Sequence, residues 1–377
     1  MNEDTAIHKG LDGVVVDTTR ISKVMPEINA LVYGGYPVQE LAENCRFEEV
    51  AWLVWHGELP TAKELAAFEA DERSRRHISP ALVEVIRKAP RTAHPMDVLR
   101  TAVSFFGMED TSPEKTDAVT NLNRSIDLLA KIPTMIGAFY RFRKGQEFIP
   151  PRSDISMAEN FFHVCHGRVP APEVVRAFDV SLTLYAEHGF NASTFTARTV
   201  VSSLSDLYSG VVGGIASLKG PLHGGANEAV MHMLLEINDP KIARDWMLKA
   251  LKEKRKIMGF GHRVYKNGDS RVPTMKKYAQ KMAAFTGEKK WLEIADTLEA
   301  TMLEQKNIHP NLDFPSGPAY YMMGIDIDMY TPVFVVARIT GWTAHIMEQL
   351  ANNALIRPLS KYTGPAQRSV TPIAKRN

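Results

Sequence analysis

The sequence predicts a mainly α fold in two domains, with a small β element near the N-terminus. Apolar residues at helical spacing fill most of the 377 residues. Strand signals are confined to a valine-rich stretch at 13–17 and to residues 31–33, which precede the turn sequence GGYP at 34–37. The chain shows no internal repeat and no low-complexity linker.

Helices are expected in order along the chain. The apolar stretch at 48–56 ends at Gly57, with Pro60 beyond, which is typical of a helix stop. A charged, turn-rich loop at 109–117 separates a helix at 95–106 from one at 121–131. Thr331 before Pro332 is typical of an N-cap and a first helical residue, and opens a long helix to about 353. Apolar periodicity predicts further helices at 171–187, 194–209, 226–237, 241–256, 273–285 and 291–305.

Two clusters of glycine and proline, at 219–225 and 314–318, bracket a basic, helical middle section. We therefore expect a small domain over 223–324. The large helical domain would comprise 1–222 and 325–377.

The charge balance and the cysteines exclude few functions but indicate a compartment. Lys plus Arg number 45 against 43 for Asp plus Glu, so nothing demands a nucleic acid or an anionic membrane as partner. Two cysteines are too few for a disulfide framework and indicate a reduced, cytoplasmic protein. No secretory signal and no apolar run long enough to cross a bilayer is visible.

His223 lies just before the predicted helix start at Ala226. A helix N-terminus carries partial positive charge, which disfavours an imidazolium. A neutral histidine can donate a hydrogen bond to a developing enolate oxygen. The alternative is a histidine packed at a helix end without a chemical role.

His262 follows Gly259, Phe260 and Gly261, a pattern that predicts an unusual loop with exposed backbone N–H groups. Such a loop can hold a phosphate or an adenine edge. The basic run at 252–256 lies just upstream and is either a solvated helix face or a site for nucleotide phosphates.

Asp313 stands between Leu312 and Phe314. A carboxylate against apolar neighbours tends to have a raised pKa, which suits a general base. A simple turn aspartate is the other interpretation.

Arg338 lies on an apolar helix, with Phe334 and Trp342 one turn away on either side. An arginine there is costly to bury without an anion. Either a substrate carboxylate, bound bidentately, or an internal Asp or Glu would fill this role. Arg357, beyond the helix, reads equally well as an ordinary exposed residue.

No metal motif is present, because His188, His223 and His262 lie in separate loops without a carboxylate at ligand spacing. The sequence also lacks a Walker loop, a strand-linked GxGxxG and a Gly-x-Ser-x-Gly elbow.

Taken together, these segments resemble the citrate synthase family. GPLHGGANE at 220–228 looks like the signature around the first catalytic histidine, GFGH at 259–262 matches the second, and NLD at 311–313 matches the catalytic aspartate. The resemblance runs over nearly the whole chain, from GLDG at 10–13 to NALIRP at 353–358.

The resemblance implies a homodimer whose small domain closes over the ligands, and a chemical role for each motif. Asp313 would remove the α-proton of an acyl-CoA, His223 would stabilise the enol oxygen, and His262 would polarise the oxaloacetate ketone. CoA thioester would be a substrate, with no permanently bound cofactor and no metal. Oxaloacetate would bind to His188, Arg271, Arg338 and, from the partner subunit, Arg357, and CoA to Lys256, Ile257, Met258, Gly259 and Phe260.

The acyl group is either propionyl or acetyl. The segments at 185–195, 319–324 and 341–349 look most like 2-methylcitrate synthases of propionate metabolism and its methylcitrate cycle, which often retain acetyl-CoA activity. A dedicated citrate synthase of the tricarboxylic acid cycle is the alternative, since short bacterial citrate synthases carry similar segments. More remote hypotheses are a histidine-based metallohydrolase and a non-catalytic protein that binds CoA or a dicarboxylate.

Overall fold

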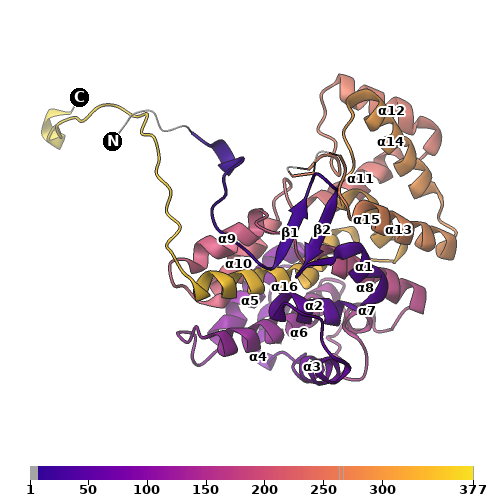
Figure 1. Ribbon diagram of the computed structural model, residues 1–377, viewed down its shortest axis with the longest axis horizontal. Coiled ribbons are helices and arrows are strands. Elements are labelled where there is room, and N and C mark those ends of the chain that lie inside the picture. Colours follow the sequence, from indigo (N-terminus) through magenta and orange to yellow (C-terminus); the bar gives the residue numbers. More distant parts are fainter. Residues whose placement is uncertain (1–6, 263, 266, 377) are drawn as a thin grey trace.

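A computed structural model of the protein describes residues 7–262, 264–265 and 267–376. The predicted mainly α fold, with a small β element near the N-terminus, is confirmed (Figure 1). The helices of the described chain are α1 (Val38–Asn44), α2 (Phe47–His56), α3 (Ala62–Ser74), α4 (Pro80–Arg87), α5 (Pro95–Met108), α6 (Ala118–Arg143), α7 (Met157–His166), α8 (Pro172–Tyr185), α9 (Ala192–Val201), α10 (Leu207–Leu218), α11 (Ala226–Ile237), α12 (Ala243–Lys252), α13 (Val272–Thr286), α14 (Lys290–Lys306), α15 (Asp313–Met322) and α16 (Tyr330–Ala351).

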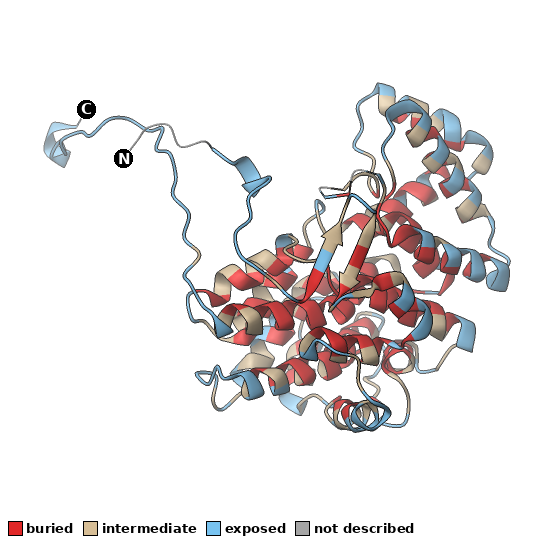
Figure 2. Cartoon of the chain, viewed as in Figure 1, coloured by how far each residue is buried: buried red, intermediate tan, exposed pale blue. Residues whose placement is uncertain are grey.

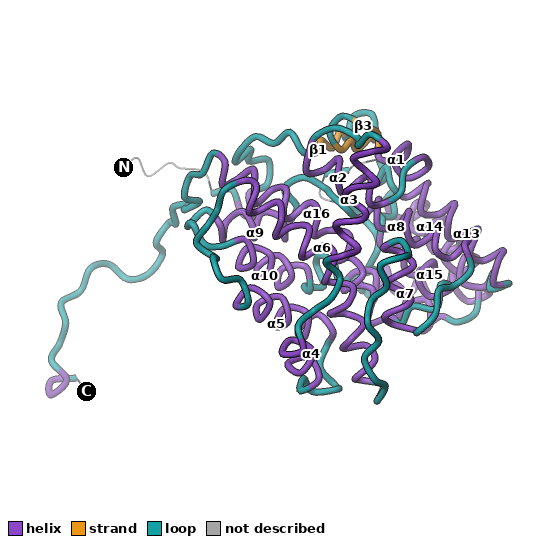
Figure 3. Tube along the Cα trace, turned by 90° about the horizontal axis from the view of Figure 1, so that it is seen from below, coloured by secondary structure: helices purple, strands orange, loops and turns teal. Residues whose placement is uncertain are grey.

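The sheet is a small antiparallel meander of β1 (Ser22–Met25), β2 (Ala30–Tyr33) and β3 (Tyr36–Pro37). Figure 3 shows it at one edge of the helical body, next to α1 and α2. Its register pairs Ser22 with Tyr33. The predicted turn is present, and Gly34 and Gly35 take φ angles of 54° and 92°, a region that favours glycine.

The strand predicted at 13–17 is wrong. This segment has no regular structure, and Val15 is 89% exposed. Valine supplies β propensity, but a strand also needs a neighbouring ladder to pair with. The first strand begins only at Ser22, where β2 provides that ladder.

Helix α16 forms the centre of the larger group of helices. It packs against α2, α6, α8, α9 and α10 and is buried along most of its length (Figure 2). Trp342 is fully buried, and a Cβ added to Gly214 of α10 would lie 3.0 Å from its indole ring. Glycine at this position therefore allows α10 to approach α16 closely.

Helices α11 to α15 form a second group at one end of the molecule (Figure 1). Within it, α15 packs against α11 and α13, and α12 packs against α14. The chain leaves this group through Gly324, which has a φ of 79°. Immediately afterwards, Asp326 forms an ion pair over 2.7 Å with Lys144, the residue that caps the C-terminal end of α6. Asp328 pairs with Arg143, the last residue of α6, so this connection is fixed to the larger group.

The single helix predicted at 194–209 is two helices, α9 and α10. Between them, Leu204 takes a left-handed φ of 66°. Asp206 then caps α10 by accepting a hydrogen bond from the Ser209 N–H over 2.9 Å. An aspartate before an apolar run is a helix-start signal, which the unbroken apolar periodicity concealed.

Three further expectations are corrected. The helix predicted at 121–131 extends over Ala118–Arg143 and includes Pro133, within a stretch that is buried on nearly all sides. The Gly/Pro cluster at 314–318 is helical and belongs to α15, where Pro315 falls in the first turn and its missing N–H is not needed. Thr331 is not an N-cap, because α16 begins at Tyr330, and its hydroxyl instead donates to Glu228.

The C-terminal segment after α16 runs away from the helical body (Figures 1 and 2). It is extended, and nearly all its side chains are exposed, including Leu355, Leu359, Tyr362 and Val370. Among the helices that the structure describes, none combines the length and the apolarity needed to cross a membrane.

Candidate active site

One cavity of about 840 Å³ brings most of the candidate residues together. It lies between the two groups of helices, with α15 and the loops before α11 and α13 on one side and α16 on the other. Facing it are His188, His223, His262, Arg271, Asp313 and Arg338, together with the whole loop from 256 to 260. Arg357 is different, because it lies exposed in the C-terminal segment and does not line the cavity of its own chain.

His223 is held by the start of α9. Its Nε2 accepts a hydrogen bond from the backbone N–H of Ser193 over 3.3 Å and lies 2.8 Å from the Ser193 hydroxyl. That hydroxyl in turn accepts from the indole N–H of Trp342 over 3.0 Å. Since a backbone N–H can only donate, the geometry assigns the acceptor nitrogen to Nε2 and the proton of a neutral His223 to Nδ1.

The pKa of His223 is lowered to about 3, first by burial and then by the charge of Arg338. The expected neutral imidazole is therefore present, and it does lie just before α11. The sequence predicts the helix N-terminus as the cause, whereas in the structure the cause is desolvation together with a neighbouring cation.

His262 has the opposite tautomer. Its Nδ1 accepts the backbone N–H groups of Val264 and Tyr265 over 3.0 and 3.2 Å, so a neutral ring carries its proton on Nε2. Burial, followed by the charge of Arg271, lowers the pKa of His262 to about 4. The preceding Gly259 has a φ of 81°, and a Cβ there would lie 2.6 Å from a methyl carbon of Val230. This loop therefore requires glycine.

Asp313 is the first residue of α15, not a turn aspartate, and it lines the cavity. Tyr185 donates its phenolic O–H to the Asp313 carboxylate over 2.8 Å. Burial raises the pKa of Asp313 to about 6, and the bond from Tyr185 acts in the opposite direction. A carboxylate in this state is ionised at neutral pH yet basic enough to accept a proton.

Arg338 forms the cationic part of the opposite wall. It is 1% exposed, its Nε donates to the Tyr185 carbonyl over 2.8 Å, and its guanidinium lies over the Phe334 ring. Within the described part of the chain, no carboxylate lies within ion-pair distance of it. Burial lowers its pKa only to about 10, so the side chain remains a cation without a direct counter-ion among the described residues.

Arg271 and His188 complete this wall. Arg271 already has a counter-ion, because it forms a bidentate ion pair with Asp269 over 2.9 and 2.7 Å. The His188 ring lies 5.0 Å from that of His262, and its Nε2 is buried without a hydrogen-bond partner among the described residues. Burial holds the pKa of His188 well below its usual value, so its ring is neutral.

The loop at 256–260 runs along the cavity on the side of the second helix group. Lys256 is exposed, while the Phe260 ring packs 4.5 Å from that of Phe314, just beyond Asp313. The basic run upstream is less available than the sequence indicated, because Arg255 forms an ion pair with Glu236 over 2.7 Å.

The sequence reading missed three parts of this site. Tyr185 and Ser193 contact Asp313 and His223, although each lies far from its partner in the sequence. The segment from Val14 to Asp17 also borders the cavity. Its valines predict a strand, but the segment has no regular structure. Nothing in local periodicity could identify these residues, since only the tertiary fold brings them to the cavity.

Comparisons with known proteins agree on one family. The family model described as "Citrate synthase, C-terminal domain" matches residues 10–359. The chain is 55% identical over 369 residues to a citrate synthase of Mycolicibacterium smegmatis, covering 98% of each. It is also 55% identical over 368 residues to a 2-methylcitrate synthase of Mycobacterium tuberculosis, covering 98% of this chain and 93% of the relative.

A solved structure gives the same result. The citrate synthase of Thermoplasma acidophilum, in a ternary complex with carboxymethyl coenzyme A and oxaloacetate, matches with a TM-score of 0.94 and 34% identity. The match covers 98% of this chain and 100% of the solved one. The resemblance read from the sequence motifs is therefore confirmed, and this chain belongs to the citrate synthase family.

Proposed function

We propose that this enzyme condenses a short acyl-CoA thioester with oxaloacetate and water to give 2-methylcitrate or citrate and free CoA. The observation that carries the proposal is the cavity itself. It combines a carboxylate of raised pKa, Asp313, with two neutral histidines of opposite tautomer and a buried cation, Arg338, that has no direct counter-ion in the part of the chain that the structure describes.

The first step is formation of the enol. Asp313 removes a proton from the carbon next to the thioester carbonyl, while Nδ1–H of His223 donates a hydrogen bond to the carbonyl oxygen. A base and an oxyanion donor are needed together, because the negative charge moves from the carbon to the oxygen as the proton leaves. Ser193 supports this role by keeping Nε2 of His223 as an acceptor.

The second step joins the two substrates. The enol carbon attacks the ketone carbon of oxaloacetate, and Nε2–H of His262 donates its proton to the ketone oxygen, which becomes the hydroxyl of the product. Arg338, Arg271 and His188 hold the oxaloacetate carboxylates. Water then attacks the thioester carbonyl, the carbon–sulfur bond breaks, and CoA leaves as the thiol.

The loop at 256–260 is proposed to hold the CoA moiety, with Lys256 exposed toward its phosphates. The section 223–324 is proposed to act as a small domain that closes on the large domain, 1–222 and 325–377. The position of the cavity between the two helix groups supports this arrangement. Closure would exclude water until condensation is complete.

A homodimer is part of the proposal, with Arg357 reaching the oxaloacetate site of the partner subunit. The extended C-terminal segment supports it, because Leu355, Leu359 and Tyr362 expose 63%, 81% and 76% of their surface in the single chain. Exposed apolar side chains in such numbers are typical of a segment that another surface covers.

The choice of acyl group stays between propionyl and acetyl, with propionyl-CoA as our main proposal. Relatives of equal identity, 55%, carry the names citrate synthase and 2-methylcitrate synthase. One additional methylene in a pocket is worth only about 1–3 kcal/mol, so use of both thioesters is physically expected. The deciding measurement is kcat/KM for each thioester at saturating oxaloacetate.

The central experiment is release of free thiol from propionyl-CoA or acetyl-CoA, with and without oxaloacetate. The proposal requires release that depends on oxaloacetate, and release from neither thioester would contradict it. A chelator is the control for the metallohydrolase hypothesis, which gains no support from the described residues, since they contain no cluster of three metal-ligating side chains. A non-catalytic binding protein would bind the ligands without thiol release.

A further inference from the structure

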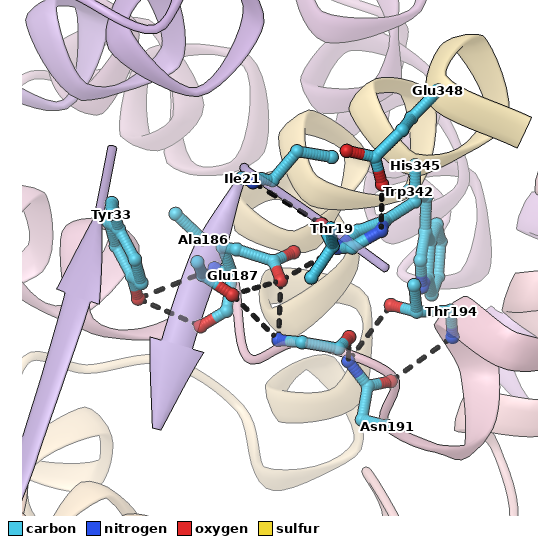
Figure 4. Close-up of polar contacts among 12 residues, drawn as sticks. Thr19, Ile21, Tyr33, Ala186, Glu187, Asn191, Thr194, Trp342, His345 and Glu348 are labelled. Atoms are coloured by element: carbon cyan, nitrogen blue, oxygen red, sulfur yellow. Dashed lines mark hydrogen bonds and ion pairs between the residues drawn. The ribbon is translucent and has the colours of Figure 1, made fainter. Parts of the chain in front are cut away.

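A buried carboxylate, Glu187, lies directly behind the oxaloacetate wall and has no part in the steps above. Its Oε1 accepts hydrogen bonds from the Ser22 hydroxyl over 2.9 Å and from the N–H of Gly189. Its carbonyl accepts from the Tyr33 hydroxyl over 2.9 Å (Figure 4). Ser22 of β1 and Tyr33 of β2 thus hold the backbone next to His188 in place through their hydrogen bonds to Glu187.

His345 of α16 is the direct partner of this carboxylate. It is fully buried, and its Nε2 lies 2.9 Å from Oε1 of Glu187 (Figure 4). On its other side, Nδ1 lies 3.7 Å from Glu348 and 3.4 Å from the guanidinium of Arg198. The Phe190 ring covers it edge-on. Burial opposes a charge on this ring, but the two carboxylates raise the pKa of His345 above its usual value.

The second oxygen of Glu187 faces α16. A Cβ added to Gly341 would lie 2.1 Å from Oε2, so the carboxylate presses against the helix backbone three residues from Arg338. This oxygen is buried and has no hydrogen-bond partner among the described residues. Glu187 is therefore the carboxylate with the strongest electrostatic effect on Arg338. Its direct contact, however, is with His345 and not with the arginine.

We propose that Glu187 and His345 form a positioning pair that fixes His188 in the wall and keeps the Arg338 guanidinium available for a substrate carboxylate. The inference rests on the proposed function, because it assigns oxaloacetate to this wall. Without the charge of His345, Glu187 would become an uncompensated anion one helical turn from Arg338. It would then compete with the substrate for the same cation.

The test begins with His345→Gln, which retains a hydrogen-bond donor toward Glu187 and removes the charge. The KM for oxaloacetate should rise at least about tenfold, the scale of one charge-assisted hydrogen bond. The KM for the acyl-CoA should stay within about threefold, since the pair does not reach the CoA loop. Calorimetry of oxaloacetate binding, without acyl-CoA, provides a readout that is independent of turnover.

The double variant Glu187→Gln/His345→Gln removes both charges and restores the net charge of the wild type. The KM for oxaloacetate should return to within about threefold of the wild-type value. Persistent weakening in the double variant would overturn the electrostatic part of the proposal. Equal weakening toward both substrates in the single variant would indicate a merely structural role and would also overturn it. His166→Gln, which alters a histidine of α7 outside the cavity, is the matched control.

The wild-type enzyme allows the same test if His345→Gln fails to fold. Oxaloacetate affinity, measured as the pH is raised from about 6, should weaken where His345 loses its proton, above the pH at which an ordinary histidine does so. Glu187→Gln should lack this alkaline weakening, and its persistence there would overturn the proposal. Failure of the proposed function is distinguishable, because the wild-type enzyme would then bind no oxaloacetate and release no CoA.

Discussion

The Tyr185 hydroxyl donates a hydrogen bond to the Asp313 carboxylate over 2.8 Å, so the carboxylate that we propose as the general base is held by the last residue of α8. Burial raises the pKa of Asp313 to about 6, and this bond opposes the rise by stabilising the ionised form. The same residue supplies the carbonyl that accepts from Arg338. Tyr185 thus contacts both Asp313, the base proposed for the acyl-CoA, and Arg338, the cation proposed for oxaloacetate.

Tyr185→Phe should move the acidic limb of the kcat/KM profile for acyl-CoA to higher pH. Without the hydroxyl, the ionised carboxylate loses a charge-assisted bond, and its pKa rises further, by about one unit. The measurement is the pH dependence of kcat/KM at saturating oxaloacetate. Tyr320→Phe is the matched control, since its buried hydroxyl bonds to Ser181 instead. An acidic limb that does not move in Tyr185→Phe would contradict the role given to this bond.

Asp313→Asn should abolish condensation while oxaloacetate still binds. An amide cannot accept the α-proton, and loss of a general base costs about a thousandfold in rate. Oxaloacetate affinity should change little, because Arg338 and His188 remain in place. Thiol release and calorimetry on the same preparation separate the two effects. Substantial turnover in this variant would remove Asp313 from its role.

The same substitution should stabilise the fold above neutral pH. The pKa of Asp313 is raised from 3.8 to about 6 in the folded state, so the folded state binds the proton more tightly than the unfolded chain. The stabilisation that this proton gives is fully present below 3.8 and is lost as the pH rises through about 6. A neutral amide avoids that loss, so Asp313→Asn should gain roughly 3 kcal/mol at pH above 7 and little near pH 4. Denaturant unfolding at both pH values measures the difference, and equal gains at both would contradict the argument.

Helical periodicity predicted the helices whose apolar stripe is bounded by clear start and stop residues. It failed where the apolar pattern and the start or stop residues indicated different boundaries. The helix predicted at 226–237 coincides with α11. At Leu204, however, a left-handed residue breaks an apolar pattern that continues on both sides. At Pro315 and Pro318 the opposite occurs, because the fold tolerates in α15 residues that usually mark a loop. Local pattern cannot decide such cases, since tertiary packing overrides propensity.

The site was predictable as a set of motifs but not as a set of contacts. The order of His223, His262 and Asp313 in family-like segments indicated the chemistry. The sequence left open whether an internal carboxylate neutralises Arg338. Glu187 lies 151 positions away, and the orientation of its carboxylate depends on the contact with His345. The structure answers this question for the described chain, where Glu187 contacts His345 and leaves the arginine without an ion pair.

Complementation between inactive variants should test the shared active site. Arg357→Ala and Asp313→Asn should each be nearly inactive alone. In a hybrid dimer, the Arg357→Ala subunit keeps its own Asp313 and receives Arg357 from its partner, so one site is intact. Random pairing makes about half of the dimers hybrid, which restores about a quarter of the wild-type activity per subunit.

The control pair for this experiment is Asp313→Asn with His223→Ala. Both residues line the cavity of one chain, so each site of that hybrid carries a lesion and no activity should return. Co-expression with two affinity tags isolates the hybrids, and size-exclusion chromatography confirms that they are dimers. Hybrids of Arg357→Ala and Asp313→Asn that form but stay inactive would contradict the contribution of Arg357 across the interface. If activity returns in the hybrid of Arg357→Ala with Asp313→Asn, and not in the control hybrid, then Arg357 acts in the partner's site.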